Sequence, residues 1–166
     1  MVDVVTYVTQ YTPWGEMVLA ANARGLVAMR FTDQGVPSHW QAASRSQASA
    51  SDVLGQAASW LKRFASDPTQ GQHALPPLDE ASATSFQRKV WKLLDRIPSG
   101  TTTSYSDLAK QLDSSPRAVG RAVGSNPWLL LRPCHRVVGA NGQLTGYAGG
   151  LPRKQALLMH EGASTV

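Results

Sequence analysis

The chain has 166 residues, of which 42% are hydrophobic, and this is enough for one domain or for two small ones. It contains no apolar run long enough to span a bilayer, and Met1–Thr12 alternates apolar and polar residues as a strand does, unlike a secretory leader. We therefore expect a cytoplasmic protein without membrane attachment. Cys134 is the only cysteine, which excludes an internal disulfide and a cysteine-based zinc site, and the four histidines lack metal-ligand spacing.

Charge is divided unevenly along the chain. Residues 1–79 hold five Lys and Arg against six Asp and Glu, whereas residues 80–166 hold eleven against five. A basic segment attracts polyanions, because neutralising phosphates releases counterions and gives an affinity that does not depend on nucleic-acid sequence. Basic surfaces also serve solubility alone, so the charge by itself leaves both interpretations open.

The first part of the chain is predicted to form a small antiparallel sheet. Alternating polarity predicts three strands, namely Val2–Thr9, Met17–Asn22 and Gly25–Phe31. A turn at Pro13–Gly15 joins the first two. The stretch Gln34–Ser51, which includes the Ser/Ala-rich residues 42–51, has no periodicity and predicts an exposed loop without an assigned function.

An amphipathic helix is predicted after this loop. Asp52 stands at its N-cap position, and apolar residues at helical spacing form the face that covers the sheet: Val53, Ala57, Trp60, Leu61 and Phe64. Asp67–Asp79 then combines proline, glycine and polar residues, which predicts a linker. We therefore expect an N-terminal structural domain over residues 1–79 and a second domain over residues 80–166.

The second domain is predicted to begin with a helix. Thr84 and Gln87 form a capping-box pattern, and apolar residues follow at helical spacing as far as Ile97, before Pro98–Gly100 ends the helix. Trp91 lies on this apolar stripe. We interpret it as a core residue rather than as a platform on which a base stacks.

A helix-turn-helix is predicted next. Tyr105–Leu112 is a short helix, Asp113–Ser115 is the turn, and Pro116 is the first residue of a second helix. The tandem RAVG repeat places equivalent residues on neighbouring turns of that helix. Its valines can face the core, while its alanines and glycines form a surface of little bulk, flanked by Arg117 and Arg121. Such a surface lets a helix approach DNA closely, and close packing inside the protein is the alternative.

Cys134 lies in the segment PCHR, between the apolar run Trp128–Leu131 and the sequence VVG with Asn141–Gly142. This order predicts a strand, a corner that carries the thiol, a second strand and a tight turn. A thiol reacts as its thiolate, so we expect the surroundings of Cys134 to lower its pKa. His135 points to the opposite face of an extended chain, so proton transfer between the two needs a bridging water or a bend. Taken without its context, a lone cysteine is more often a small core residue.

Several spaced motifs agree with one family. PCHRV, with Asn126–Pro127 before it and GYAGG and LLMHEG after it, resembles the O6-alkylguanine-DNA alkyltransferases, and the resemblance runs from Phe86 to Gly162. It implies an α+β fold, with an RNase H-like α/β lobe around a small antiparallel sheet and a mainly helical, winged-helix-like C-terminal lobe. It also implies a monomer that repairs double-stranded DNA without a cofactor. The alkyl group of O6-alkylguanine, and of O4-alkylthymine, would move irreversibly to Cys134.

The resemblance implies catalytic roles for individual residues. Cys134 is the nucleophile, and its supporting groups are His135, Glu161, Asn126 and Tyr105. Glu161 orients His135, which takes the thiol proton through water. Asn126 organises the turn before the thiol, and Tyr105 helps to neutralise the departing guanine.

The resemblance also implies how the damaged base is held. The second helix enters the minor groove and Arg117 fills the gap left by the flipped nucleotide, with Arg121 as the less favoured alternative. Further DNA contacts are expected from Ala118, Tyr105 and Arg136. The alkylated base is expected in a pocket formed by Tyr147, Ala148, Val137, Leu129, Val123 and Gly149.

Three other classes of protein remain as alternatives. A helix-turn-helix regulator would explain the basic half of the chain but not the PCHR corner. A cysteine hydrolase would explain Cys134, but its base normally comes from elsewhere in the chain. An alkyltransferase-like protein binds lesions without transferring the alkyl group and has another residue in place of the cysteine, so Cys134 argues against that class.

Overall fold

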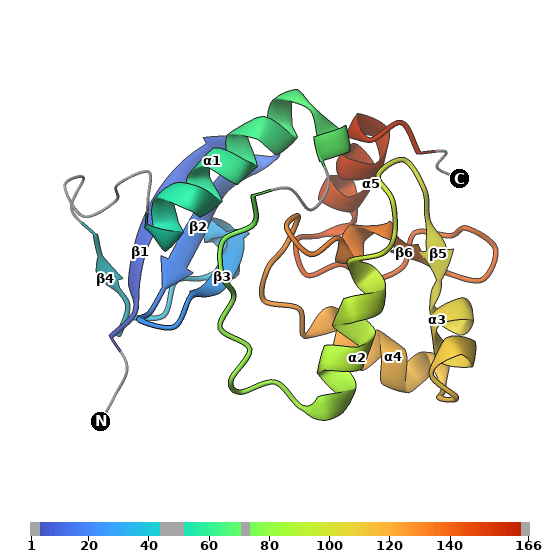
Figure 1. Ribbon diagram of the computed structural model, residues 1–166. Coiled ribbons are helices and arrows are strands. Elements are labelled where there is room, and N and C mark those ends of the chain that lie inside the picture. Colours follow the sequence, from blue (N-terminus) through green and yellow to red (C-terminus); the bar gives the residue numbers. More distant parts are fainter. Residues whose placement is uncertain (1–3, 44–51, 71–73, 164–166) are drawn as a thin grey trace. The chain divides into compact units, whose positions relative to one another are not determined.

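The protein divides into two compact units, Met1–Ser82 and Ala83–Val166, and its fold is of the α+β class. The computed structural model describes residues 4–43, 52–70 and 74–163 (Figure 1). None of the helices in these ranges is long and apolar enough to cross a membrane.

The first unit contains a four-stranded sheet. Its strands are β1 (Thr6–Thr12), β2 (Gly15–Ala21), β3 (Leu26–Phe31) and β4 (Gln41–Ala42), in the order β3-β2-β1-β4. The three antiparallel strands were predicted, although the first was expected to begin at Val2, outside the described residues. The short strand β4 pairs with β1 in parallel, so the sheet is not purely antiparallel, and part of the expected loop after Gln34 is a strand.

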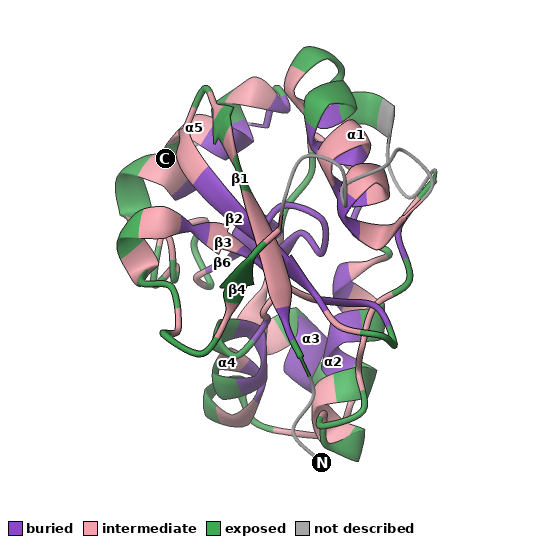
Figure 2. Ribbon diagram, turned by 90° about the vertical axis from the view of Figure 1, so that its left-hand side faces the viewer, coloured by how far each residue is buried: buried purple, intermediate pink, exposed green. Residues whose placement is uncertain are grey.

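Helix α1 (Val53–Ser66) packs against β1 and β2 (Figure 1). The Asp52 side chain accepts a hydrogen bond from the Gly55 amide, as expected of an N-cap. The buried face of α1 differs from the prediction at one position, because Leu54 rather than Val53 is buried. Figure 2 shows the buried residues of β2 as a continuous purple stretch. On the other face of the sheet, a smaller apolar cluster includes Val18, Ala20 and Trp40.

The stretch expected to be a linker contributes to the first unit. The Leu26 amide donates to the carbonyl of Pro77 at 2.8 Å, and the Asp79 amide donates to the carbonyl of Leu26 at 3.0 Å. Gly25 has a φ of +155°, and a Cβ added there would lie 2.6 Å from the Pro77 oxygen. Only glycine permits this close approach, so the end of the expected linker is fixed to the sheet.

The second unit is mainly helical. Its helices are α2 (Ser85–Leu94), α3 (Tyr105–Gln111), α4 (Pro116–Gly124) and α5 (Leu151–His160), and its two short strands are β5 (Thr103–Ser104) and β6 (Val137–Val138). The capping box of Thr84 and Gln87 forms as predicted, and Trp91 is buried.

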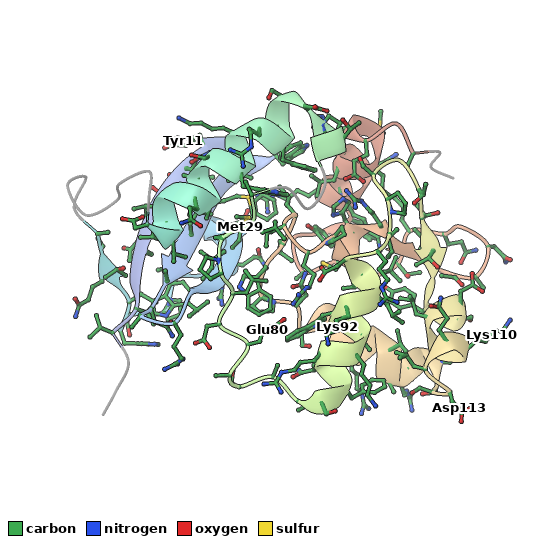
Figure 3. The ribbon with its side chains drawn as sticks, viewed as in Figure 1. Tyr11, Met29, Glu80, Lys92, Lys110 and Asp113 are labelled. Atoms are coloured by element: carbon green, nitrogen blue, oxygen red, sulfur yellow. The ribbon has the colours of Figure 1, made fainter. Side chains whose placement is uncertain are left out.

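The predicted helix-turn-helix is α3 and α4. The hydroxyl of Ser115 accepts a hydrogen bond from the Ala118 amide at 3.1 Å, which fixes the start of α4. In the turn, Asp113 has a φ of +50°, a conformation that aspartate tolerates better than most residues. Figure 3 shows Lys110 and Asp113 extending away from this end of the motif.

Candidate active site

The chain that leads to Cys134 differs from the prediction. Trp128–Leu131 is a tight turn rather than a strand, and Leu130 has a φ of +69°. Cys134 begins the short 3₁₀ helix η3 (Cys134–Arg136), and β6 follows directly. The expected corner and second strand are therefore present, but a compact turn delivers the thiol to its place.

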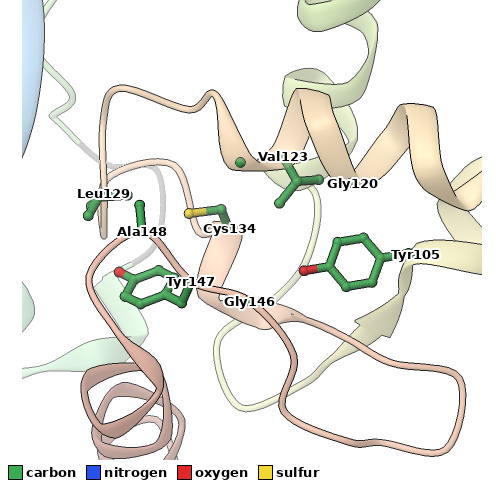
Figure 4. Close-up of a pocket in the computed structure, with 9 residues that line it drawn as sticks. Tyr105, Gly120, Val123, Leu129, Cys134, Gly146, Tyr147 and Ala148 are labelled. Carbon is green, nitrogen blue, oxygen red and sulfur yellow. The ribbon is translucent and has the colours of Figure 1, made fainter.

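Cys134 is one wall of a cavity of about 170 Å³ in the second unit. The cavity is lined by Tyr105, Gly120, Val123, Gly124, Leu129, Cys134, Gly146, Tyr147 and Ala148. Figure 4 shows the Cys134 side chain among these residues, with the Tyr105 hydroxyl directed toward the space around it. The lining is mostly apolar, with two tyrosines, so the cavity suits the faces of a flat aromatic group such as a base.

Four of the six residues expected to form the pocket line this cavity: Tyr147, Ala148, Leu129 and Val123. The two others do not. Val137 is fully buried in β6, and Gly149 lies beyond the part of the loop that meets the cavity. The glycines of the RAVG repeat were expected to form a surface of little bulk on α4. Gly120 and Gly124 line the cavity, and Gly124 is also exposed.

Burial raises the pKa of the Cys134 thiol to about 11, although a hydrogen bond with the Asn126 side chain and the charge of Lys154 act in the opposite direction. The expectation of a lowered pKa is therefore wrong for the protein without DNA. Desolvation disfavours the thiolate more than its neighbours favour it. The thiol is protonated at neutral pH, so any reaction of the sulfur must include removal of its proton.

Asn126 holds the backbone beside the thiol. Its amide nitrogen donates to the carbonyl of Arg132 at 2.9 Å, and its carbonyl oxygen accepts from the Trp128 amide at 3.0 Å. The side chain is buried, so these bonds are not exchanged with water. This agrees in geometry with the turn-organising role that the sequence suggested for Asn126.

His135 and Glu161 lie together in the interior. The His135 Nε2 atom is 3.1 Å from the Glu161 Oε2 atom, and both side chains are fully buried. The ring N–H does not point squarely at the carboxylate, so the contact is electrostatic more than a well-formed hydrogen bond. Burial lowers the pKa of His135, partly offset by Glu161, which leaves a neutral ring near pH 7. Its Nδ1 atom has no hydrogen-bond partner among the described residues.

Arg136 was expected to contact DNA, but its side chain lies in the protein interior. Its guanidinium is buried, donates from Nε to Glu161 Oε1 at 2.9 Å and donates from Nη1 to the carbonyl of Ile97 at 2.6 Å. Burial alone would raise the pKa of Glu161, but its close contact with His135 and its hydrogen bonds with Arg136 outweigh this effect and lower the pKa to about 2. Arg136 therefore compensates a buried carboxylate and is not available to phosphates.

Lys154 was missed by the sequence analysis. Its Nζ atom donates to the carbonyls of Thr145 at 2.7 Å and Gly146 at 3.1 Å, and thus ties α5 to the loop that lines the cavity. Burial lowers the pKa of Lys154 to about 8, and the charge of the Cys134 thiolate opposes that shift. A signal was present, because Lys154 precedes Leu158 by four residues and so lies on the buried face of α5.

The exposed side of the helix-turn-helix carries the expected arginines. Arg117 and Arg121 are both exposed on α4, and Ala118 is partly exposed between them. Val119 and Val123 are buried, as the repeat predicted. Ala122 is also buried, so the small-residue surface is narrower than the repeat suggested. Among the described residues, no three His, Cys, Asp or Glu side chains gather as a metal site would require.

The second unit thus places one buried cysteine beside a helix-turn-helix, a motif that is common in DNA-binding proteins. A family model described as "6-O-methylguanine DNA methyltransferase, DNA binding domain" matches residues 85–163. A methylated-DNA–protein-cysteine methyltransferase of Mycolicibacterium paratuberculosis is 40% identical, and the match covers 95% of this chain and 92% of that relative. The chain belongs to the methylated-DNA–protein-cysteine methyltransferase family.

Solved structures agree with this assignment. The crystal structure of Mycobacterium tuberculosis O6-methylguanine methyltransferase has a TM-score of 0.80 and 35% sequence identity, and the match covers 96% of this chain and 93% of that one. A second crystal structure, titled as Mycobacterium tuberculosis OGT in complex with DNA, has a TM-score of 0.76 and 36% identity, with coverage of 95% and 92%.

Proposed function

We propose that the protein repairs DNA directly, by moving the alkyl group of O6-alkylguanine, and of O4-alkylthymine, to the sulfur of Cys134. The observation that carries this proposal is the place of Cys134 in a cavity walled by Tyr105, Tyr147 and the glycines of α4. The wall that holds the reactive atom and the helix that carries the exposed arginines are thus adjacent. A base that leaves the duplex beside α4 can therefore enter the cavity directly.

Double-stranded DNA is the partner that this arrangement fits. A reaction at a base atom inside a duplex requires the nucleotide to be rotated out of the base stack. A side chain that fills the gap left in the stack lowers the free-energy cost of this rotation. We assign the filling role to Arg117 at the first turn of α4, while Arg121 contacts the backbone one turn later. The small side chain of Ala118 lets α4 approach the minor groove. The DNA complex of the Mycobacterium tuberculosis relative supports DNA as the partner.

The reaction is an in-line displacement in which the Cys134 sulfur replaces O6 on the alkyl carbon. The thiol proton of Cys134 leaves through water to the neutral ring of His135, whose positive charge Glu161 stabilises. The sulfur then forms a bond with the alkyl carbon as the bond from that carbon to O6 breaks. Tyr105 donates a hydrogen bond to the departing guanine while its negative charge develops. The guanine anion then takes a proton from water, and protonated His135 returns the thiol proton to water, so the protons balance.

The product is a thioether, which water and thiols do not reverse under mild conditions. No second cysteine can accept the alkyl group, because Cys134 is the only one in the sequence. Each molecule therefore reacts once, without a cofactor. All the assigned groups come from one chain, which supports action as a monomer, and a free thiol suits the reducing cytoplasm.

A burst experiment tests this function. Duplex with a single O6-methylguanine is supplied in excess, and repaired lesions are counted against protein. The proposal expects repair to stop at one lesion per molecule, with no repair by Cys134→Ser. Continued turnover would contradict it. Sequence-specific duplex binding without any repair would favour a regulator, and multiple turnovers of p-nitrophenyl acetate would favour a cysteine hydrolase.

A further inference from the structure

Arg132 lies between two tight turns of the backbone. The Leu131 amide donates to the carbonyl of Leu129 at 2.8 Å, closing a γ-turn around Leu130, whose φ is +69°. The Cys134 amide donates to the carbonyl of Arg132 at 2.7 Å, closing an inverse γ-turn around Pro133, with φ −80° and ψ 62°. A positive φ strains leucine, and such strain persists only where the surroundings fix the backbone firmly.

The carbonyl of Arg132 is where this segment meets the site. It accepts the Cys134 amide and also accepts the Asn126 side-chain amide at 2.9 Å. Asn126 is the residue whose hydrogen bond lowers the pKa of the thiol. A shift of this one carbonyl would therefore move the sulfur relative to the cavity and would also disturb its hydrogen bond with Asn126.

The side chain of Arg132 is held from three sides. Its Nε and Nη2 atoms donate to the two carboxylate oxygens of Asp95, each at 3.0 Å. Its guanidinium carbon lies 5.5 Å from the ring centre of Trp91 and 5.1 Å from that of Trp128, within the range of cation–π attraction. The two rings stand edge to face at 87°, and so form a corner for the planar guanidinium.

The same corner reaches the helix-turn-helix. The indole nitrogen of Trp91, on α2, donates to the carbonyl of Ala122, on α4, at 2.8 Å. Arg132, Asp95, Trp91 and Trp128 thus form one connected group, which we name the arginine clamp. It links the thiol turn to both α2 and α4.

Filling space alone does not account for this group. The Arg132 side chain is 8% exposed and that of Asp95 is 29% exposed, so the pair is partly buried, and such a pair adds little net stability compared with apolar residues of the same volume. What a fork-shaped, bidentate pair adds is a fixed direction. Because the guanidinium of Arg132 is held in one orientation, the backbone of Arg132 between the two γ-turns is held in place as well.

We propose that Arg132 is a positioning residue for alkyl transfer, because the arginine clamp holds its carbonyl, and through it the Cys134 sulfur, at the cavity. This inference rests on the proposed function. Arg132 does not touch the substrate. Its effect passes through the backbone and through Asn126.

The test compares Arg132→Met, Arg132→Lys and Asp95→Asn with the wild type. Arg24→Met is the matched control, because it removes an arginine from an Arg–Asp pair in the first unit. The measurements are the single-turnover rate of transfer at saturating methylated duplex, the affinity for that duplex, the urea midpoint and the pH profile of Cys134 labelling by iodoacetamide.

We expect Arg132→Met to slow transfer at least tenfold, with duplex affinity within twofold of the wild type. Asp95→Asn should slow transfer less than Arg132→Met does, and the rate of Arg132→Lys should lie between those of Arg132→Met and the wild type. The double variant Asp95→Asn/Arg132→Met should transfer no more slowly than Arg132→Met alone. The labelling profile of Arg132→Met should shift to higher pH, because the hydrogen bond from Asn126 is disturbed. The control should keep the wild-type rate and profile.

Transfer by Arg132→Met at the wild-type rate would overturn the inference, and so would a loss that matches the unfolded fraction with an unchanged labelling profile. Should Arg132→Met fail to fold, Asp95→Asn decides by the same two readouts. If the wild type transfers no alkyl group at all, the proposed function fails. The iodoacetamide profile then still tests whether Arg132 positions the sulfur.

Discussion

Arg136 and Glu161 form a buried, bidentate ion pair, with Arg136 Nε 2.9 Å from Glu161 Oε1. Glu161 follows the last turn of α5, where a negative charge opposes the helix dipole. The guanidinium compensates that charge, and the Glu161 Oε2 atom that it contacts also lies 3.1 Å from His135 Nε2. One pair of residues, 25 apart in sequence, thus connects the end of α5 to the residues that follow the thiol.

The first prediction concerns this pair. Arg136→Met should destabilise the protein by about 3–5 kcal/mol, because it leaves the carboxylate of Glu161 buried without its main partner. Arg24→Met should cost about 1 kcal/mol or less, since the Arg24 side chain is half-exposed and Asp79 keeps its bond with Asn22. Urea unfolding measures both changes. Equal losses in the two variants would contradict the structural role of the buried pair.

Stability in acid provides the second prediction. The pKa of Glu161 is about 2 in the folded protein, against an ordinary value of 4.5. The lowered value means that Glu161 stabilises the fold fully above its ordinary pKa, and that this contribution is lost as pH falls from there through about 2. In Glu161→Gln, the urea midpoint should depend less on pH in that window. An unchanged slope would show that Glu161 does not titrate as the structure indicates.

The third prediction concerns the thiol itself. With a pKa of about 11, Cys134 should react with iodoacetamide about tenfold faster for each pH unit up to that value, without a plateau near neutrality. Mass spectrometry of the Cys134 peptide follows the rate. A plateau below pH 9 would show that the thiol is acidic before DNA binds.

Lys154 gives a related, fourth prediction. Its positive charge favours the Cys134 thiolate, so Lys154→Gln should raise the thiol pKa and slow labelling near pH 7.5, by up to about tenfold for a shift of one unit. The help from Lys154 fades as it loses its own proton around pH 8. Lys92→Gln, at an exposed position of α2, is the matched control and should label like the wild type.

The fifth prediction separates the two exposed arginines of α4. Arg117→Ala should slow repair of methylated duplex much more than reaction with free O6-benzylguanine, because the free base needs no flipping. Arg121→Ala should weaken duplex binding and lower its salt dependence, with a smaller effect on the rate of repair at saturating DNA. Equal losses on duplex and free base in Arg117→Ala would refute its gap-filling role.

Local signals predicted much of this fold. The capping box of Thr84 and Gln87 and the cap of Ser115 involve residues three apart, so the sequence contains the whole interaction. The apolar spacing of α1 and the alternating polarity of the three antiparallel strands could also be predicted, because each pattern is contained in a short stretch of sequence. The two-residue strand β4 was not, because it depends on an edge that only the folded sheet provides.

The site was harder to predict wherever partners are distant in sequence. Arg136 looked like a DNA contact beside Cys134, and only the fold shows Glu161 at its side. The thiol pKa was misjudged because the desolvation of Cys134 cannot be read from neighbouring residues. The turn at Leu130 was read as a strand because an apolar run has the same appearance in either structure.

Mass mapping after reaction with O6-methylguanine duplex tests the central claim most directly. The account predicts that each protein molecule gains one methyl group, that the methyl is on the peptide containing Cys134, and that the duplex is returned with an unmodified guanine. An unchanged protein mass, or a methyl group on any other residue, would contradict it.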